Sequence, residues 1–332
     1  MKIAVFGAGS TGCYLGGLLS LADNEVTLIC RPRIKDMIEQ AGGLTLTDFE
    51  GQHEQLMPSR LITEVTDDTN MHFDIVLVTL KCHHLISAQE DLVKLSQGGA
   101  KLIFMQNGLG SLELISEQLP PEKVLQGITP FNVLSKDQAT FHRGTEGAMI
   151  FQRCPETKVL KQQFEALGFP CELYDDMRPA IYGKLLMNLN NAINAIADLP
   201  IKTQLQNRRC RKVLAGAMKE WLAVTNAVGV DLIQYTAIKP ALVPYVLALP
   251  NLLFEALAKK MIAIDPEARS SMWEDIQAGR KTEIEFLNGA VADLAQQTKI
   301  PAPINHGISK LVTAKEQGEN VTLEQLFALL SQ

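Results

Sequence analysis

The sequence predicts two domains of different classes: an α/β domain with a doubly wound, mostly parallel sheet over residues 1–176, and an all-helical domain over residues 177–332. Short apolar runs of strand character alternate with amphipathic stretches in the first domain, a pattern typical of a parallel sheet with helices on both faces. No strand-like run follows residue 177. Long helical segments interrupted by prolines continue from there to the C-terminus.

The α/β domain begins with a buried strand at residues 2–6, KIAVF, because a short apolar run that ends at a glycine is typical of a parallel-sheet strand. A helix is expected from the glycine turn to about residue 22. The other predicted elements are strands at 25–30, 74–80, 100–105 and 123–128 and helices at 84–96 and 109–119.

Beyond residue 130 the pattern changes. The run ATFHRGTEGAMIF at 139–151 is typical of two strands joined by a glycine-containing turn, which predicts an antiparallel edge. An amphipathic helix at 158–169 and a strand at 171–175 complete the domain. In the helical domain the breaks are expected at Pro200, Pro240, Pro244, Pro250, Pro266, Pro301 and Pro303.

The composition excludes several classes of protein. The 332 residues suffice for two domains with sizeable cores, and 46% hydrophobic with 20% charged residues is ordinary for a soluble chain. A net charge of −6 without a dense basic run argues against a nucleic-acid surface. No apolar run reaches the roughly 18–20 residues of a membrane helix. The six cysteines lack a paired spacing, so we expect reduced thiols and a cytoplasmic protein.

The first candidate site is the turn GAGSTG, in which Gly7, Gly9 and Gly12 have the spacing G-x-G-x-x-G between a predicted strand and a predicted helix. Gly7 permits the tight turn, Gly9 lets the backbone approach a pyrophosphate, and Gly12 allows close helix packing. The helix N-terminus, which includes Ser10 and Thr11, offers free N–H groups to the anion. We therefore expect a bound dinucleotide; the alternative is a glycine-rich turn without a ligand.

The end of the second strand indicates which dinucleotide binds. An NAD-preferring site usually carries an acid there, which bonds the ribose hydroxyls. This chain has Arg31 and Arg33, with Lys35 close behind and no acid before Asp36. A cluster of cations suits a 2′-phosphate, so NADP(H) is the expected cofactor; the alternative is a solvated basic loop.

Two later stretches lie where further cofactor contacts are expected, at the carboxyl ends of strands. Lys81 follows the strand at 74–80, and Asn107 with Gly108 follows the strand at 100–105. Either stretch can equally be a simple strand terminus. The adjacent Cys82-His83-His84 is the single metal-like cluster in the sequence, and adjacent residues point in different directions on a helix, so no metal is expected.

The amide-rich run YGKLLMNLNNAINAIADLP is the second candidate site. On a helix, Lys184, Asn188 and Asn191 fall within roughly 60° of one another and form one polar stripe on an otherwise apolar element. Lys184 can donate a proton to a carbonyl oxygen as hydride reaches its carbon, and the amides can orient a substrate. Asn190 and Asn194 point elsewhere and are expected to serve packing or capping.

The expected partner of this helix is the stretch at 269–289. Glu283 lies in a helix-like run, and its carboxylate can engage a substrate hydroxyl or keep the helix lysine charged. A substrate carboxylate can be bound by Ser270 or Ser271, with positive charge from Arg280 and Lys281. The alternative for Glu283 is an exposed helix carboxylate.

Together these stretches resemble the ketopantoate reductase (2-dehydropantoate 2-reductase) family, in the family's order and over most of the chain: GAGSTG, Arg31, TLKCHH, QNGLG, YGKLLMN, SSMWEDI, KTEIEFLNG and IPAPINHGI. The resemblance implies a Rossmann domain joined to a helical domain of the type at the C-terminus of 6-phosphogluconate dehydrogenase, with the active site in the cleft between them. It also implies NADPH-dependent reduction of 2-dehydropantoate to pantoate, in pantothenate and coenzyme A biosynthesis.

The resemblance implies a role for individual residues. Lys184 matches the general acid, and Glu283 matches the carboxylate that binds the substrate hydroxyl. The other matches are Asn107 to the amide beside the nicotinamide, Lys81 to the cofactor-side lysine, Asn188 to the first amide of the catalytic helix, Ser271 to the carboxylate-binding serine and Arg31 to the 2′-phosphate contact.

The chain departs from the family pattern at Ala192, where the family has a second Asn four residues after the first. Asn191 is nearer the polar stripe and is expected to substitute; otherwise one substrate bond worth about 1–3 kcal/mol is missing. This leaves two alternatives to ketopantoate reduction: a reductase of another 2-keto or 3-hydroxy acid on the same scaffold, or an NADP(H)-binding sensor without catalysis. Extra helical sequence at 240–260 and the tail at 321–332 are candidates for reshaping the cleft or for a homodimer contact.

Overall fold

The structure is a computed structural model that describes residues 1–66, 72–257 and 267–331. The chain forms two compact units: unit 1 comprises residues 1–106 and 111–177, and unit 2 comprises residues 107–110 and 178–332. The end of the helical sequence expected at 240–260 and the predicted break at Pro266 lie outside the described residues.

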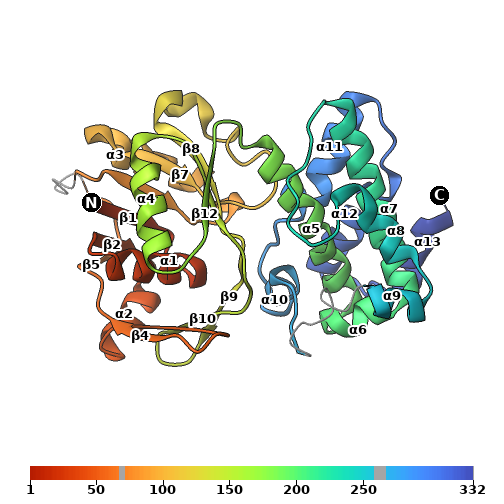
Figure 1. Ribbon diagram of the computed structural model, residues 1–332, viewed down its shortest axis with the longest axis horizontal. Helices are drawn as coiled ribbons and strands as arrows, with labels where there is room; N and C mark the ends of the chain where they lie inside the picture. Colours follow the sequence, from red (N-terminus) through yellow and green to blue (C-terminus); the bar gives the residue numbers. More distant parts are fainter. Residues whose placement is uncertain (67–71, 258–266, 332) are drawn as a thin grey trace. The chain divides into compact units, whose positions relative to one another are not determined.

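Unit 1 is built on an eight-stranded sheet of order β12-β11-β8-β7-β6-β1-β2-β5 (Figure 1). Its six strands from β8 to β5 are parallel, β11 runs antiparallel to β8, and β12 runs parallel to β11. The bounds are β1 Lys2–Phe6, β2 Glu25–Ile29, β5 Arg60–Ile62, β6 Ile75–Val78, β7 Lys101–Phe104, β8 Val124–Ile128, β11 Met149–Gln152 and β12 Cys171–Tyr174.

Helices cover both faces of this sheet, which confirms the doubly wound class. Side chains alternate along β1, so Ile3 and Val5 enter one core and Ala4 and Phe6 enter another. The first core is closed by α1 (Ser10–Leu21) and α4 (Pro155–Ala166), which lie side by side in Figure 1. The second is closed by α3 (Gln89–Ser96), and α2 (Pro32–Gln40) follows β2.

A second, four-stranded sheet of order β4-β3-β10-β9 was not expected. Its strands are β3 Leu44–Asp48, β4 His53–Leu56, β9 Val133–Lys136 and β10 Thr140–Arg143. The hairpin predicted at 139–151 is therefore wrong, although both strands exist and the antiparallel edge, β8 with β11, is confirmed. Buried Arg143 at the end of β10 pairs with Asp48 at 2.7 Å, and this contact holds β10 beside β3.

The helix predicted at 109–119 is also wrong: the segment consists of turns and one short 3-10 helix, Ser116–Gln118. Gly108 and Gly110 both have φ of +84°, in the left-handed region that an α-helix cannot contain. The helix predicted at 84–96 is partly right, because its first residues form 3-10 turns and α3 begins only at Gln89.

Unit 2 is helical, and within residues 178–257 and 267–331 no strand occurs. Its helices are α5 Arg178–Ala197, α6 Ile201–Gln206, α7 Arg208–Ala227, α8 Val243–Ala248, α9 Asn251–Leu257, α10 Ser271–Gln277, α11 Asn288–Thr298, α12 Pro303–Glu316 and α13 Leu323–Ala328 (Figure 1). The long α5 packs against α7, α10 and α12, so most of its surface is buried. Among the described residues, no helix has the length and apolar character to cross a bilayer.

Candidate active site

The glycine turn of unit 1 leaves room where a diphosphate is expected. Gly7 has φ of +87°, and a side chain on Gly12 would meet the Thr79 hydroxyl at 2.5 Å, so these two glycines serve the turn and the packing. A Cβ on Gly9 would meet nothing closer than the turn's own Gly7 carbonyl at 3.9 Å. Helix α1 starts at Ser10 without a side-chain cap, so the N–H groups of its first turn are available to an anion.

Arg31 and Lys81 lie at the same edge of the sheet as the glycine turn, because β2 and β6 flank β1 and all three are parallel. Arg31 is the exposed N-cap of α2, and Lys81 is the N-cap of the 3-10 turn Cys82–His84. The Arg31 guanidinium donates to His84 Nε2 at 3.1 Å. Of the three cations expected at the 2′-phosphate, Lys35 instead pairs with Glu39 of its own helix at 3.4 Å.

In unit 2, α5 carries Lys184, Asn188 and Asn191 as expected. Lys184 is half-buried, and desolvation lowers the pKa of its ammonium to about 8. Asn188, one turn further on, is buried and donates from Nδ2 to the Asn107 side-chain oxygen at 3.3 Å. Helix α5 is therefore linked to the loop at 107–110.

Asn190 and Asn194 hold other elements in place, which confirms their expected packing and capping role. Asn190 accepts a hydrogen bond from Gln204 at 2.7 Å. Asn194 donates to the Leu199 carbonyl at 2.8 Å and accepts from the Ser270 backbone at 2.9 Å. The bond from Ser270 fixes the start of α10 against α5, and the other two hold the segment at 199–204 beside it.

A polar pocket in unit 2 joins residues that are far apart in the sequence. It is lined by Asn107, Asn191, Ser271, Met272, Asp275, Glu283 and Leu287. Its free volume is about 10 Å³, close to the space that one water molecule occupies, so a larger ligand requires side chains to move.

The two serines expected at this site differ in their surroundings. Ser270 is buried as the N-cap of α10, where its hydroxyl accepts from Trp273 N at 3.1 Å and donates to the Asn191 carbonyl at 3.0 Å. Ser271 lines the pocket. Ser271 is therefore the serine that a pocket ligand can reach.

Glu283 lies just before the 3-10 turn Ile284–Phe286, so the expected helical run is partly right: it starts only after Glu283 and becomes α-helical at Asn288. Thr282 N donates to the Glu316 carboxylate at 2.7 Å, and the Phe286 carbonyl accepts from Leu109 N at 2.9 Å. Because these bonds fix the chain on both sides of Glu283, its position relative to the loop at 107–110 is well defined.

Asp275 is the polar pocket residue that sequence reasoning missed; the apolar Met272 and Leu287 were not expected there either. Asp275 is buried and pairs with Arg280 at 2.9 Å. The available signal was its position four residues after Ser271, which places both on one face of a helix. Arg280 and Lys281, expected to supply positive charge, are balanced by Asp275 and Glu285 respectively.

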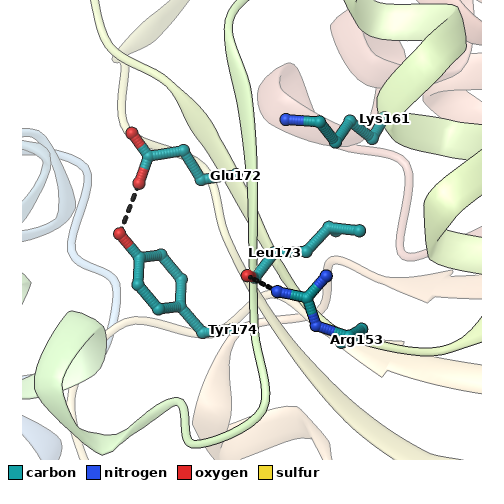
Figure 2. A pocket seen from close by; sticks show the side chains of 5 residues that line it. All are labelled: Arg153, Lys161, Glu172, Leu173 and Tyr174. Carbon is teal, nitrogen blue, oxygen red and sulfur yellow. Dashed lines mark hydrogen bonds between the residues drawn. The ribbon is translucent and has the colours of Figure 1, made fainter.

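Unit 1 contains a second cavity, of about 300 Å³, beside the edge strand β12 (Figure 2). Its two cations bind the strand's outward-facing carbonyl groups: Arg153 donates to Leu173 O at 2.7 Å and Lys161 to Cys171 O at 2.5 Å. They block a site where another strand would pair, which is a common protection of sheet edges. Among residues 1–66, 72–257 and 267–331, no three His, Cys, Asp or Glu side chains are grouped to hold a metal.

Comparison with protein families gives two matches that together span most of the chain. The model described as "Ketopantoate reductase PanE/ApbA" matches residues 3–156, and the one described as "Ketopantoate reductase PanE/ApbA C terminal" matches residues 176–316. A curated relative from Halobacterium salinarum, named 2-dehydropantoate 2-reductase, is 25% identical over 320 residues, covering 94% of this chain and 98% of the relative.

Solved structures give a similar result. A PanE/ApbA family ketopantoate reductase from Ralstonia eutropha JMP134 superposes with a TM-score of 0.78 at 27% identity, covering 96% of this chain and 99% of that one. A D-mandelate dehydrogenase solved with NADH and anilino(oxo)acetate shares the fold, with a TM-score of 0.78 at 22% identity over 97% of this chain and 100% of that one.

Proposed function

We propose, from the premise that this chain belongs to the ketopantoate reductase family, that it is an oxidoreductase that reduces 2-dehydropantoate to pantoate with NADPH. In this proposal residues 1–176 hold the cofactor, and residues 177–332 together with Asn107 provide the substrate-binding and catalytic groups. The observation that carries the proposal is the polar pocket, where Asn107, Asn191, Ser271 and Glu283 are brought together from four separate segments.

The pocket offers groups suited to a small keto acid. The Ser271 hydroxyl and the Asn191 amide can donate to the substrate carboxylate, and the Glu283 carboxylate can accept from a substrate hydroxyl. Asn188 donates to the Asn107 side chain and so holds Asn107 in place in the pocket lining. The buried Asp275 is paired with the exposed Arg280, so its carboxylate repels the anionic substrate less than an unpaired carboxylate would.

Lys184 is the proposed proton donor. A bound NADPH supplies the hydride to the keto carbon. As the carbonyl oxygen gains the electron pair of the C=O π bond, the Lys184 ammonium donates its proton to that oxygen and becomes a neutral amine, which takes a new proton from solvent. A pKa of about 8 leaves the ammonium mostly protonated at neutral pH and makes it a better donor than an exposed lysine.

The residues of unit 1 fit an NADP(H) molecule. The open space over Gly9 and the uncapped N-terminus of α1 suit a pyrophosphate. Arg31 occupies the position where an acid would bond the ribose hydroxyls of NAD, and its charge suits a 2′-phosphate. The related D-mandelate dehydrogenase was solved with NADH, so the cofactor preference rests on Arg31 and not on the fold.

Reduction of a different 2-keto acid is the second candidate, because of Ala192. Its side chain is fully buried in the helical core, so the amide that the family pattern places there is replaced by apolar packing. Asn191 lines the pocket and is our proposed substitute. A site that relies on Asn191 presents its amide one position earlier on α5, which changes the shape of the substrate-binding wall.

The test follows NADPH absorbance with ketopantoate, pyruvate and longer 2-keto acids, each repeated with NADH. We expect ketopantoate with NADPH to give the highest kcat/KM. A higher kcat/KM for another keto acid would replace ketopantoate by the second candidate. Tight NADPH binding without turnover of any keto acid would identify the chain as a sensor and contradict the proposed reaction.

A further inference from the structure

We infer that His84 binds the 2′-phosphate of NADPH together with Arg31, and that the preference of this chain for NADPH over NADH therefore depends on the protonation of His84. The inference rests on the proposed function. It adds a second residue that selects the cofactor and a dependence of that selection on pH. The sequence stretch TLKCHH contains this residue, but it gave His84 no role at the cofactor.

The geometry places two basic side chains together at the cofactor edge of the sheet. Arg31 follows β2 and His84 ends the 3-10 turn after β6, on either side of β1 and its glycine turn. The Arg31 Nη2 and His84 Nε2 atoms are 3.1 Å apart. Arg31 is also the N-cap of α2, so the partial positive charge of that helix adds to the two side chains.

The contact defines the state of the ring when no anion is bound. A guanidinium has only donors, so His84 Nε2 must be the acceptor. The ring is then neutral with its proton on Nδ1. If Nε2 took a proton, two donors would face each other and the contact would break, unless an acceptor bound to both.

The charged groups that act on His84 are cations. Arg31 and Lys81 are the charged groups that act on it, and the ring of His83 lies against it at 4.3 Å between centroids. Burial first, and then Arg31 and Lys81, lower the pKa of His84. In the part of the chain that the structure describes, no carboxylate forms an ion pair with Arg31, and the nearby Glu39 is bound to Lys35.

A 2′-phosphate supplies an acceptor for both side chains and a negative charge beside them. Its oxygens can accept from Arg31 and from a protonated His84 Nε2 at once, which is a charge-assisted arrangement. The dianion raises the pKa of His84 from its lowered value, so NADPH binding takes up a proton. The contribution of His84 to NADPH affinity is complete below the pKa of the free chain and is lost as the pH rises through the pKa of the complex. NADH lacks this phosphate and gains nothing from the proton.

The test measures the dissociation constants of NADPH and NADH by fluorescence titration from about pH 6 to about pH 9, across the range in which histidines titrate. It compares the unchanged chain with His84→Gln, which keeps a donor but cannot titrate. The matched control is His142→Gln, because His142 is another unit 1 histidine of lowered pKa and bonds Thr47 in the second sheet. The 2′-phosphate itself titrates near pH 6 in all three proteins, so their differences report the histidines.

We expect the ratio of the NADH to the NADPH dissociation constant to fall with rising pH more steeply in the unchanged chain and in His142→Gln than in His84→Gln. The excess is about tenfold for each pKa unit by which the phosphate raises His84. If the unchanged chain and His84→Gln show the same dependence of this ratio on pH and both still prefer NADPH, the role of His84 is overturned and the proposed cofactor stays intact. An unchanged chain with no preference for NADPH at any pH would overturn the proposed cofactor and the inference together.

Discussion

Two adjacent asparagines on α5 have different roles because their side chains point to different sides of the helix. Asn190 accepts from Gln204 and belongs to the packing of the helical unit, whereas Asn191 lines the polar pocket. Lys184 lies two turns before Asn191 on the same polar stripe. A lysine on an exposed stripe would keep its ordinary pKa, and desolvation lowers that of Lys184 to about 8.

This lowered pKa predicts how turnover depends on pH. The protonated amine is the acid, so kcat is expected to be highest below the pKa of Lys184 and to fall as the pH rises through about 8. The measurement is kcat at saturating keto acid and NADPH over the neutral to basic range. A kcat that stays level or rises through that interval would contradict Lys184 as the proton donor.

At the scale of elements, the short loop at 107–110 depends on one close backbone contact. Gly108 has φ of +84°, and a Cβ there would overlap the Phe286 carbonyl. Gly110 has the same φ of +84° and open space around it. Alanine at either position carries the left-handed strain, about 1–2 kcal/mol, but the overlap is specific to Gly108.

We therefore predict that Gly108→Ala lowers the free energy of unfolding and kcat/KM clearly more than Gly110→Ala does, because the Leu109–Phe286 bond and the position of Asn107 depend on this approach. Urea unfolding and steady-state kinetics of both variants make the comparison. Equal losses in the two variants would show that the contact with Phe286 does not position Asn107.

The sequence predicted those elements whose burial is uniform. The strands β1, β2, β6 and β7 are nearly continuous apolar runs buried on both faces, so they stand out. The second sheet was missed because β4 and β9 are largely exposed and because β3 pairs with β10, whose residues lie 95 positions later in the sequence. The helix at 109–119 was wrongly predicted because apolar spacing was given more weight than Gly108 and Gly110.

The candidate site was predictable where a motif specifies chemistry, as in the glycine turn and the lysine and asparagines of α5. The role of a residue was not predictable where a contact with a distant part of the chain determines it. Asp275 looks like a solvated helix carboxylate until Arg280 and the pocket surround it. His84 begins the helix predicted at 84–96, and only the structure shows that Arg31, from a different strand end, donates to it.

At the scale of the molecule, the two compact units are not two continuous stretches of sequence. Residues 107–110 follow β7 of the α/β unit, yet they are grouped with the helical unit, where Asn188 binds Asn107. A single domain boundary in the sequence, such as the one predicted after residue 176, therefore cannot separate the two units. The chain thereby places a residue from a strand end of the α/β sheet among the groups proposed to hold the substrate.

The proposed reaction divides its tasks between the units: unit 1 binds NADPH and unit 2 supplies the proton. The most direct test of this claim replaces Lys184 by alanine and uses Lys310→Ala, an exposed lysine of α12, as the matched control. NADPH binding by fluorescence and turnover of the best keto acid are measured on both variants. We predict that Lys184→Ala binds NADPH normally and loses about 10²–10⁴-fold in kcat, while Lys310→Ala keeps both. Near-normal turnover in Lys184→Ala would contradict the account.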